Sequence, residues 1–322
     1  MLRSLIDGNL SDYVRQNGGA SDLLFNGLKI TYEMEFETKF GIRGYRFKLK
    51  PTQKDSCVIS DEARYYAMGR SGWWELGDSN DDSSLLVKEA KSNSRDSQHS
   101  EPVYNAISSW QIYHFHDTSE TAAMRQYEIL QDNLFLRGNA SNIAPYLYQL
   151  REKYSSEYSE ILNAVRMVMP FFDEFYLNVV EFGEKQKLNL SWKQKGSDYP
   201  MQPYHLSDGS IRFICLATAL PQPNPPSTII IDEPELGLHP AAITILSELI
   251  QDAAKRTQVI VATQSPALID QFGIDDIITV NRENGASTFK RLNEDNFKVW
   301  LENYSVGELW TKNVISGGPT YE

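Results

Sequence analysis

Two adjacent carboxylates follow a short apolar run in the stretch STIIIDEPELGLHP, residues 227–240. The apolar residues 228–231 predict a buried strand, and an acid at the carboxyl end of a parallel strand lies at the rim where ligands bind. Asp232 can hold Mg²⁺ at such a rim, directly or through a water. Glu233 points to a different side and can accept a proton from an attacking water. The alternative is that Asp-Glu-Pro merely ends a strand with a polar turn.

Two further groups lie near this acidic strand in the sequence. In HLSDGSIR, residues 205–212, Ser207 can cap the apolar helix that follows, while the Gly209 backbone and the Ser210 hydroxyl offer hydrogen-bond donors at its positive end. In QVIVATQSP, residues 258–266, Gln264 follows a second buried strand, where it can contact a γ-phosphate or a water. Taken singly, these groups are also compatible with a plain helix cap and a plain turn.

The elements that position these groups alternate from Ser207 onward. We predict helices over residues 211–220 and 241–254, strands over 228–231, 258–262 and 276–280, and a short helix after 262. Because these strands are apolar throughout, the pattern favours a parallel sheet covered on both faces.

Upstream of Ser207 the pattern differs. We predict a helix over residues 2–15, an antiparallel β region over 28–49, and a mostly solvated loop without function over 77–101. Order resumes over 107–116, followed by helices over 143–154 and 158–172 and strands over 175–182 and 188–192.

Composition bounds the class of protein. The chain has 322 residues, 41% of them hydrophobic, which fits one large domain or two modest ones. A formal net charge of −12 gives no overall basic field that would draw the chain to DNA or anionic lipid. Cys57 and Cys215 are far apart, so we expect buried free thiols rather than a disulfide or a zinc site. No apolar run is long enough to span a bilayer, and we expect a cytoplasmic protein.

In order along the chain, the three groups resemble the ATP-binding cassette (ABC) ATPase superfamily, in its soluble SMC-like branch. Residues 206–210 look like the signature motif, 228–233 like the Walker B strand and 235–240 like the D-loop. Gln264 occupies the switch position, where most of the superfamily has histidine. The resemblance implies Asp232 as the Mg²⁺ ligand and Glu233 and Gln264 as catalytic residues.

The same resemblance implies a site for ATP shared between two copies of the chain. Ser207, Asp208, Gly209 and Ser210 would meet the γ-phosphate bound by the partner head, and His239 would lie at the dimer interface. ATP would then act as a clamp and its hydrolysis as the release.

Segments outside the cassette make the match narrower. Residues 110–119, 221–226 and 300–310 resemble a group of bacterial predicted AAA-type ATPases. The implied fold is α/β, a P-loop NTPase-type ABC core with an antiparallel β lobe and a helical insertion. We expect a lobe remnant over residues 1–119, the insertion over 120–172 and the core over 173–322. Related soluble ABC ATPases act in DNA repair or antiviral defence, so the expected partners are a second copy and DNA or an effector protein, with no membrane.

A P-loop requires Gly-x-x-x-x-Gly-Lys-[Ser/Thr], and the sequence contains no Gly-Lys pair. Met1 resembles a start inside the helix after the P-loop, so we expect a truncated ATPase that does not hydrolyse ATP in its present form and exposes an apolar sheet edge. The alternative is a non-hydrolysing pseudo-ATPase that acts as an interaction module of a defence or DNA-associated complex.

Histidines form a second candidate cluster. His114 and His116 would share one face of a strand, with Asp117 next to them. No further close-spaced ligand follows, so we expect structural hydrogen bonds rather than a metal site, and His205 and His239 are treated in the same way.

Overall fold

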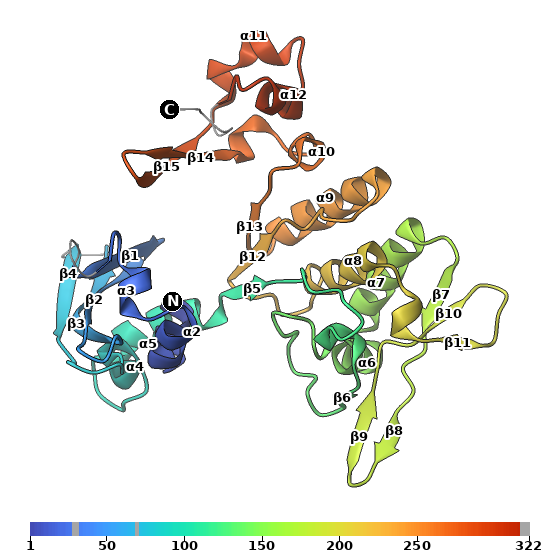
Figure 1. Ribbon diagram of the computed structural model, residues 1–322, viewed down its shortest axis with the longest axis horizontal. Coiled ribbons are helices and arrows are strands. Elements are labelled where there is room, and N and C mark those ends of the chain that lie inside the picture. The colour runs from blue at the N-terminus through green and yellow to red at the C-terminus, as the bar shows by residue number, and fades with distance from the viewer. Residues whose placement is uncertain (28–31, 68–70, 316–322) are drawn as a thin grey trace. The chain divides into compact units, whose positions relative to one another are not determined.

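The structure is a computed structural model that describes residues 1–27, 32–67 and 71–315. It contains two compact units, Met1–Trp110 and Gln111–Glu322 (Figure 1). This division falls before the expected boundary at residue 119. Residues 120–172 share a hydrophobic core with the acidic strand, since Ile161 and Phe172 belong to the same buried cluster as Ile231.

The first unit is built on a four-stranded antiparallel sheet. Its strands, paired in chain order, are β1 (Met34–Phe40), β2 (Arg43–Pro51), β3 (Cys57–Tyr66) and β4 (Gly72–Gly77). The antiparallel region predicted over 28–49 is present from residue 34 onward, and its residues 28–31 lie outside the described part of the chain. Tyr45, Phe47 and Leu49 alternate along one face and are buried, as the period of two requires.

The described part of the first unit contains five helices, and they differ from the prediction. They are α1 (Leu2–Ile6), α2 (Leu10–Gln16), α3 (Ala20–Leu23), α4 (Leu85–Ala90) and α5 (Ser97–Ser109). The single helix predicted over 2–15 is interrupted at Gly8, whose φ of +77° ends the first helix in the left-handed region that glycine tolerates.

The solvated loop predicted over residues 77–101 is wrong, because α4 and the first part of α5 lie there. The carboxylate of Glu62 is fully buried and accepts hydrogen bonds from the Leu85 and Leu86 amides at 2.7 and 3.1 Å, at the N-terminus of α4. Arg64, on the same strand, is paired with Glu89 of α4 and donates to Ser100 of α5 at 2.8 Å. Two charged residues of β3 therefore hold a segment that looks solvated from its composition.

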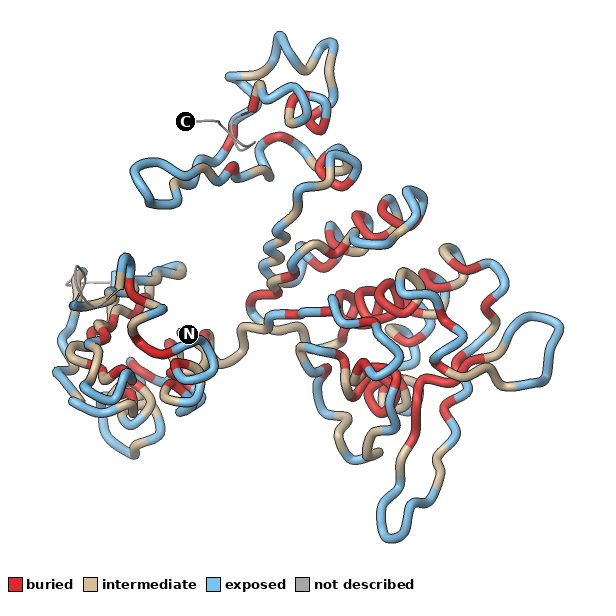
Figure 2. Tube along the Cα trace, viewed as in Figure 1, coloured by how far each residue is buried: buried red, intermediate tan, exposed pale blue. Residues whose placement is uncertain are grey.

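The second unit contains the predicted parallel sheet, with strand order β13-β12-β5. Its strands are β5 (Gln111–Tyr113), β12 (Thr228–Asp232) and β13 (Gln258–Ala262). The helices α8 (Asp208–Ala219) and α9 (Pro240–Ala254) follow the predicted spans closely, and α8 is buried along most of its length (Figure 2).

The expected cover on both faces of this sheet is found at β12 but not at β13. Residues of β13 alternate between exposed and half-buried, and Ile260 is 45% exposed. The reason is that β13 pairs with β12 alone among the described strands and forms an edge of the sheet. An apolar edge of this kind is what the sequence predicts.

The strand predicted over 276–280 does not join the parallel sheet. It is β14 (Ile278–Glu283), which pairs antiparallel with β15 (Ala286–Arg291) in a separate hairpin. Asn284 and Gly285 connect the two strands and have φ of +52° and +80°, the values of a tight hairpin turn. The dipeptide Asn-Gly predicts such a hairpin turn, whereas the alternating α/β pattern around it suggested a strand of the parallel sheet.

The remaining elements of the second unit surround this sheet or extend from it (Figure 1). They are η1 (Ala123–Arg125), β6 (Glu128–Ile129), α6 (Ile143–Lys153), α7 (Ser155–Val168), β7 (Phe172–Phe175), β8 (Val180–Phe182), β9 (Lys185–Leu188), β10 (Trp192–Gln194), β11 (Pro200–Met201), η2 (Pro203–His205), α10 (Pro266–Ile269), η3 (Ile274–Asp276), η4 (Glu294–Asn296), α11 (Lys298–Leu301) and α12 (Val306–Thr311). The helices α6, α7, α8 and α9 pack on one another and form most of the core.

Candidate functional site

Three strand ends meet at one rim of the parallel sheet. The register pairs Ile231 with Tyr113 on one side and Asp232 with Ala262 on the other, so β5, β12 and β13 end almost level. Asp232 lies at this rim with half of its side chain exposed, and Gln264 lies two residues beyond the end of β13, also exposed. The rim therefore brings together the strand ends that carry Asp232, Glu233 and Gln264. No hydrogen bond joins these three side chains to one another in the described structure.

Glu233 has an unusual backbone conformation. Its φ is +41°, in the left-handed region, whereas most other non-glycine residues with positive φ in the described chain are asparagine or aspartate. Its amide donates to the Ala262 carbonyl at 2.8 Å and its carbonyl accepts from the Leu236 amide at 3.2 Å. The turn is thus held by the neighbouring strand, and the strain of the left-handed conformation falls on the residue expected to act as a base.

The turn after Glu233 is hydrogen-bonded to the residue that follows β13, and its last residue caps α9. The Thr263 hydroxyl donates to the Glu235 carboxylate, whose second oxygen is buried and has no hydrogen-bond partner among the described residues. His239 is exposed, and its Nδ1 accepts from the Ala241 amide at 3.2 Å, so it caps α9. That cap is a local structural function, and the expected place of His239 at a dimer interface stays a prediction.

The turn at residues 206–210, called the signature turn after the motif that it resembles, has the helix cap that its sequence predicts. Ser207 accepts a hydrogen bond from the Ser210 amide at 3.1 Å, and the two hydroxyls are 2.8 Å apart. Ser207 is the N-cap of α8, a twelve-residue helix whose first turn contains Ser210, and Ser207 is exposed to solvent. The helix N-terminus and its two hydroxyls are therefore accessible to an anion.

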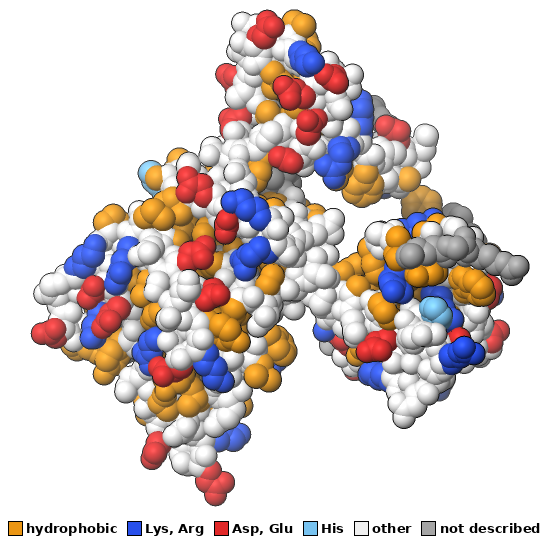
Figure 3. Space-filling view, turned by 180° about the vertical axis from the view of Figure 1, so that it is seen from behind, with side chains coloured by type: hydrophobic (Ala, Val, Ile, Leu, Met, Phe, Trp, Pro, Cys, Tyr) orange, Lys and Arg blue, Asp and Glu red, His pale blue; other side chains and the backbone are white. Residues whose placement is uncertain are grey.

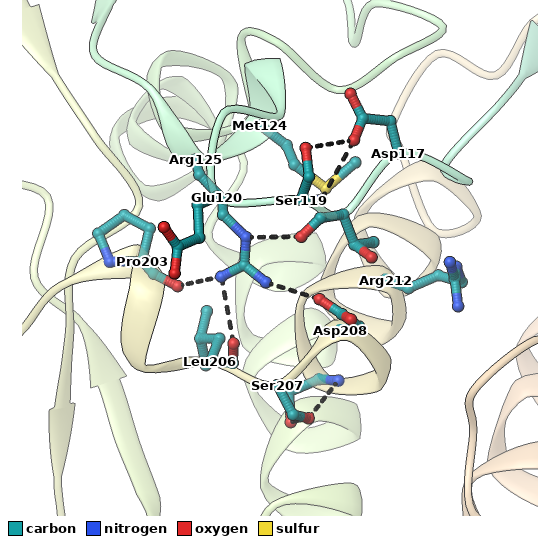
Figure 4. Close-up of polar contacts among 12 residues, drawn as sticks. Asp117, Ser119, Glu120, Met124, Arg125, Pro203, Leu206, Ser207, Asp208 and Arg212 are labelled. Carbon is teal, nitrogen blue, oxygen red and sulfur yellow. Dashed lines mark hydrogen bonds and ion pairs between the residues drawn. The ribbon is translucent and has the colours of Figure 1, made fainter.

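A buried arginine that no sequence motif singled out holds this turn through several hydrogen bonds (Figure 4). Arg125 donates to the carbonyls of Thr118 and Leu206 at 2.9 and 3.1 Å and to Asp208 at 3.1 Å, and it also contacts the Pro203 carbonyl. Its side chain is 6% exposed. Asp208 is thereby engaged in an ion pair within the chain.

The signature turn also packs directly against the D-loop. A methyl group on Gly209 would overlap the Gly237 carbonyl oxygen, and Gly237 has a φ of +75°. Beside this contact, Arg212 donates to the carbonyls of Phe115 and His116 at 3.0 and 3.2 Å and contacts the Leu236 carbonyl. Burial lowers the pKa of Arg212 from its usual value. One guanidinium therefore joins α8, the segment after β5 and the D-loop.

His116 also lies at this rim, although its sequence pattern predicted a structural role beside His114 rather than a place near Asp232. Its Nε2 lies 3.6 Å from Oδ2 of Asp232, and both side chains are partly exposed. A small hollow is lined by Phe115, His116, Arg212, Ile231, Asp232 and Glu233. The structural hydrogen bonds expected of the His114 and His116 rings are not found among the described residues, although the His114 amide donates to Gly138 at 2.8 Å. His205, by contrast, accepts from the Gln202 amide at 3.1 Å and has the structural role expected of it.

The donor groups of the rim suit a divalent cation and part of a nucleotide. Asp232 offers carboxylate oxygens, which are hard ligands of the kind Mg²⁺ prefers, at an exposed strand end. The N-terminus of α8 offers amides and hydroxyls to a phosphate. The described residues contain no cluster of three or more histidine, cysteine or acidic side chains that would form a complete metal cage. This set therefore fits a cation that also takes ligands from a bound phosphate.

Comparison with known families decides what class of protein carries this rim. Residues 1–270 match the family model described as "AAA domain, putative AbiEii toxin, Type IV TA system". The chain belongs to this AAA family. No match was found among curated proteins. The family assignment makes the rim part of a nucleotide-binding ATPase fold of the P-loop NTPase type.

Solved structures similar to this AAA chain are SMC head domains. An SMC head bound to the C-winged helix domain of ScpA is 15% identical, with a TM-score of 0.50 over 92% of this chain and 88% of that chain. A Pyrococcus furiosus SMC head with an extended coiled coil, bound to the C-terminal domain of ScpA, is 14% identical, with a TM-score of 0.47 over 94% and 88%. The Thermotoga maritima SMC head is 12% identical, with a TM-score of 0.37 over 88% and 85%. The first similarity shows the fold of an SMC head.

Charged side chains of both signs lie on the surface of the second unit. On the face of residues 111–315 seen in Figure 3, acidic and basic side chains are interspersed without a large patch of one sign. In the described part of the chain, no helix has both the length and the apolar composition that a membrane crossing requires.

Proposed function

We propose that the second unit is the signature-bearing part of an ATP-hydrolysing head that dimerises around ATP. The observation that carries the proposal is the joint placement of the Walker B strand end and the signature turn. Asp232 and Glu233 lie at the rim, and α8 packs on the D-loop through Gly209 and Gly237. The signature turn therefore contacts the segment that follows Asp232 and Glu233.

Each polar residue of the rim has a role in this proposal. Asp232 holds Mg²⁺, which when bound neutralises phosphate charge. Glu233 accepts the proton of the attacking water, and its left-handed backbone, held by Ala262, sets the direction of its side chain. Gln264 orients the same water or a phosphate oxygen through its amide, which can both donate and accept.

The signature residues act on a second copy of the chain. Ser207 and Ser210 place two hydroxyls at the N-terminus of α8, where the Ser210 amide already donates to the Ser207 hydroxyl. Because the ABC ATPases that this sequence resembles share their sites across a dimer, the γ-phosphate that these residues contact is the one bound by the partner head. Asp208 is neutralised by Arg125, which reduces its repulsion of a phosphate at the same turn.

A comparison of two variants tests this proposal in protein made from the gene's whole reading frame, including any codons upstream of Met1. Glu233→Gln is expected to keep ATP binding and to slow hydrolysis by at least ~100-fold, since the base is lost. ATP then persists, and the protein accumulates as an ATP-dependent dimer in size-exclusion chromatography with light scattering. Adding Ser207→Arg is expected to abolish the dimer, because a bulky side chain occupies the phosphate contact.

Further variants separate the roles. Asp232→Ala is expected to lose Mg²⁺-dependent nucleotide binding as well as turnover, whereas Gln264→Ala is expected to impair mainly hydrolysis. A Glu233→Gln protein that stays monomeric with ATP bound, or that hydrolyses ATP at the parental rate, contradicts the assignment.

A non-hydrolysing interaction module is the second candidate, and the absence of a Gly-Lys pair from these 322 residues is compatible with it. In that case the rim binds nucleotide without turnover, and partner choice carries the function. The description of the matching family names a putative toxin of a toxin–antitoxin system. For the module we propose a role in defence, with an effector protein or DNA as partner. Absence of ATPase activity from the whole reading frame, together with nucleotide-independent partner capture, would support the module.

A further inference from the structure

We propose that His116 is a ligand of the cation held by Asp232, and that this nitrogen makes the site prefer a first-row transition-metal dication over Mg²⁺. The inference rests on the proposed function only in taking Asp232 as a cation ligand. Its basis is the meeting of an imidazole and a carboxylate from distant segments at one sheet rim, 3.6 Å apart.

The spacing between the two side chains favours a shared cation over a direct hydrogen bond. At 3.6 Å, His116 Nε2 and Asp232 Oδ2 are farther apart than hydrogen-bonded nitrogen and oxygen atoms. Two ligand atoms that each lie about 2.1 Å from one metal are roughly 3.0 to 3.5 Å apart in tetrahedral or octahedral geometry. A small rotation of either exposed side chain brings the pair into that range.

The backbone holds the imidazole at this place. Arg212 donates to the carbonyls of Phe115 and His116, and Arg212 is itself 5% exposed. On the other side, Asp232 is held in register between Ala262 and the segment after Tyr113. Because both ligands start from fixed backbone, little ordering is needed when a cation binds.

The ligand types determine which cation is preferred. A site with carboxylate and water ligands suits Mg²⁺, whereas an imidazole nitrogen suits transition metals, whose affinity for nitrogen rises along the series from Mn²⁺. Two protein ligands leave open positions for water or phosphate oxygens. The site therefore takes Mn²⁺ or a heavier dication through one nitrogen and one carboxylate oxygen.

Direct binding of Mn²⁺ to the 322-residue chain tests this inference without ATP or turnover. Free Mn²⁺ is followed by electron paramagnetic resonance, and pulsed measurements at substoichiometric Mn²⁺ detect coupling to a ligand ¹⁴N. The chain is expected to show this coupling, and His116→Gln is expected to lose it and to weaken Mn²⁺ binding by about tenfold or more. Competing Mg²⁺ is expected to bind His116→Gln and the parent within about threefold of each other.

Two control variants make the result specific. His114→Gln removes a neighbouring exposed imidazole and is expected to leave the ¹⁴N coupling and the Mn²⁺ affinity unchanged. Asp232→Asn is expected to weaken both Mn²⁺ and Mg²⁺. The proposal is overturned if the parent chain shows no ¹⁴N coupling or no Mn²⁺ binding, if His116→Gln binds Mn²⁺ as the parent does, or if His114→Gln has the same effect. ATPase activity of the protein made from the whole reading frame, together with an absence of ¹⁴N coupling in the 322-residue chain, would reject His116 as a ligand and leave the proposed function standing.

Discussion

The first turn of α8 and the D-loop approach so closely at Gly209 and Gly237 that a methyl group on Gly209 would overlap the Gly237 carbonyl oxygen. The overlap involves backbone on both sides, so no flexible side chain can move to relieve it. Gly209 is required for packing rather than for its backbone angles, because Gly237 has a positive φ and Gly209 does not.

Gly209→Ala is expected to destabilise α8 although alanine is the better helix former. At an unhindered helix position this change stabilises a protein by about 0.4–1 kcal/mol. Here the overlap is expected to cost about 1–3 kcal/mol, as overpacking does. Hydrogen exchange of the α8 amides measures the difference. Gly273→Ala, whose added carbon would meet only Asp276 at 3.6 Å, is the control and is expected to change nothing measurable in α8. Unchanged α8 protection in Gly209→Ala would contradict the close contact.

Glu233→Gly is expected to stabilise the chain while removing the proposed base. A non-glycine residue in the left-handed region costs about 1–2 kcal/mol, which glycine relieves in the folded state. Because glycine also gains freedom in the unfolded state, the expected net gain in the free energy of unfolding is about 0.5–1 kcal/mol. Glu233→Gln keeps the strain and is expected to match the parent in urea denaturation. Equal midpoints for Gly and Gln variants would show that the turn is not strained.

Glu62→Gln is expected to release α4 from the first unit. The Glu62 carboxylate accepts from the Tyr45 and Ser84 hydroxyls at 2.7 and 2.8 Å as well as from two amides of α4. An amide group would turn donors toward these donors and leave them unsatisfied, at a cost of about 3 kcal/mol. Loss of hydrogen-exchange protection in α4 is the measurement. Asp61→Asn, one residue earlier on the same strand, is the control, and equal protection in both variants would argue against the buried carboxylate as the anchor.

The two cysteines are expected to be unreactive in the folded chain. Both are free and buried, as predicted from the sequence. Burial, with a smaller contribution from Asp55, raises the pKa of Cys57 to about 11, and burial raises the pKa of Cys215 further. At pH 8 both are therefore neutral thiols, and the reactive thiolate is scarce. A chromogenic disulfide reagent should label neither thiol in native protein and both after unfolding. Rapid labelling of native protein would contradict the buried positions.

Much of the ATPase core could be predicted because its signals are local in sequence. Each of three signals spans no more than a dozen consecutive residues: the apolar run before Asp232, the cap at Ser207 and the strand before Gln264. Each element forms where its pattern predicts it. The helix cap needs only Ser207 and the Ser210 amide. Local hydrogen bonding and hydrophobic periodicity determine such elements, so the sequence alone specifies them.

What the sequence could not specify are the contacts between residues far apart in the chain. His116 and Asp232 are brought together only because β5 and β12 pair in parallel, and Glu62 reaches α4 only because β3 is folded against it. The Asn284-Gly285 turn is a local signal, but the longer α/β pattern around it predicted a strand of the parallel sheet instead of a hairpin. Residues of β13 are exposed because this strand forms an open edge of the sheet. The amino-acid sequence by itself determined the acidic strand, the signature turn and the free thiols. The tertiary structure alone decided which imidazole meets Asp232, because strand order and register, rather than spacing along the chain, set the distance between side chains from different segments.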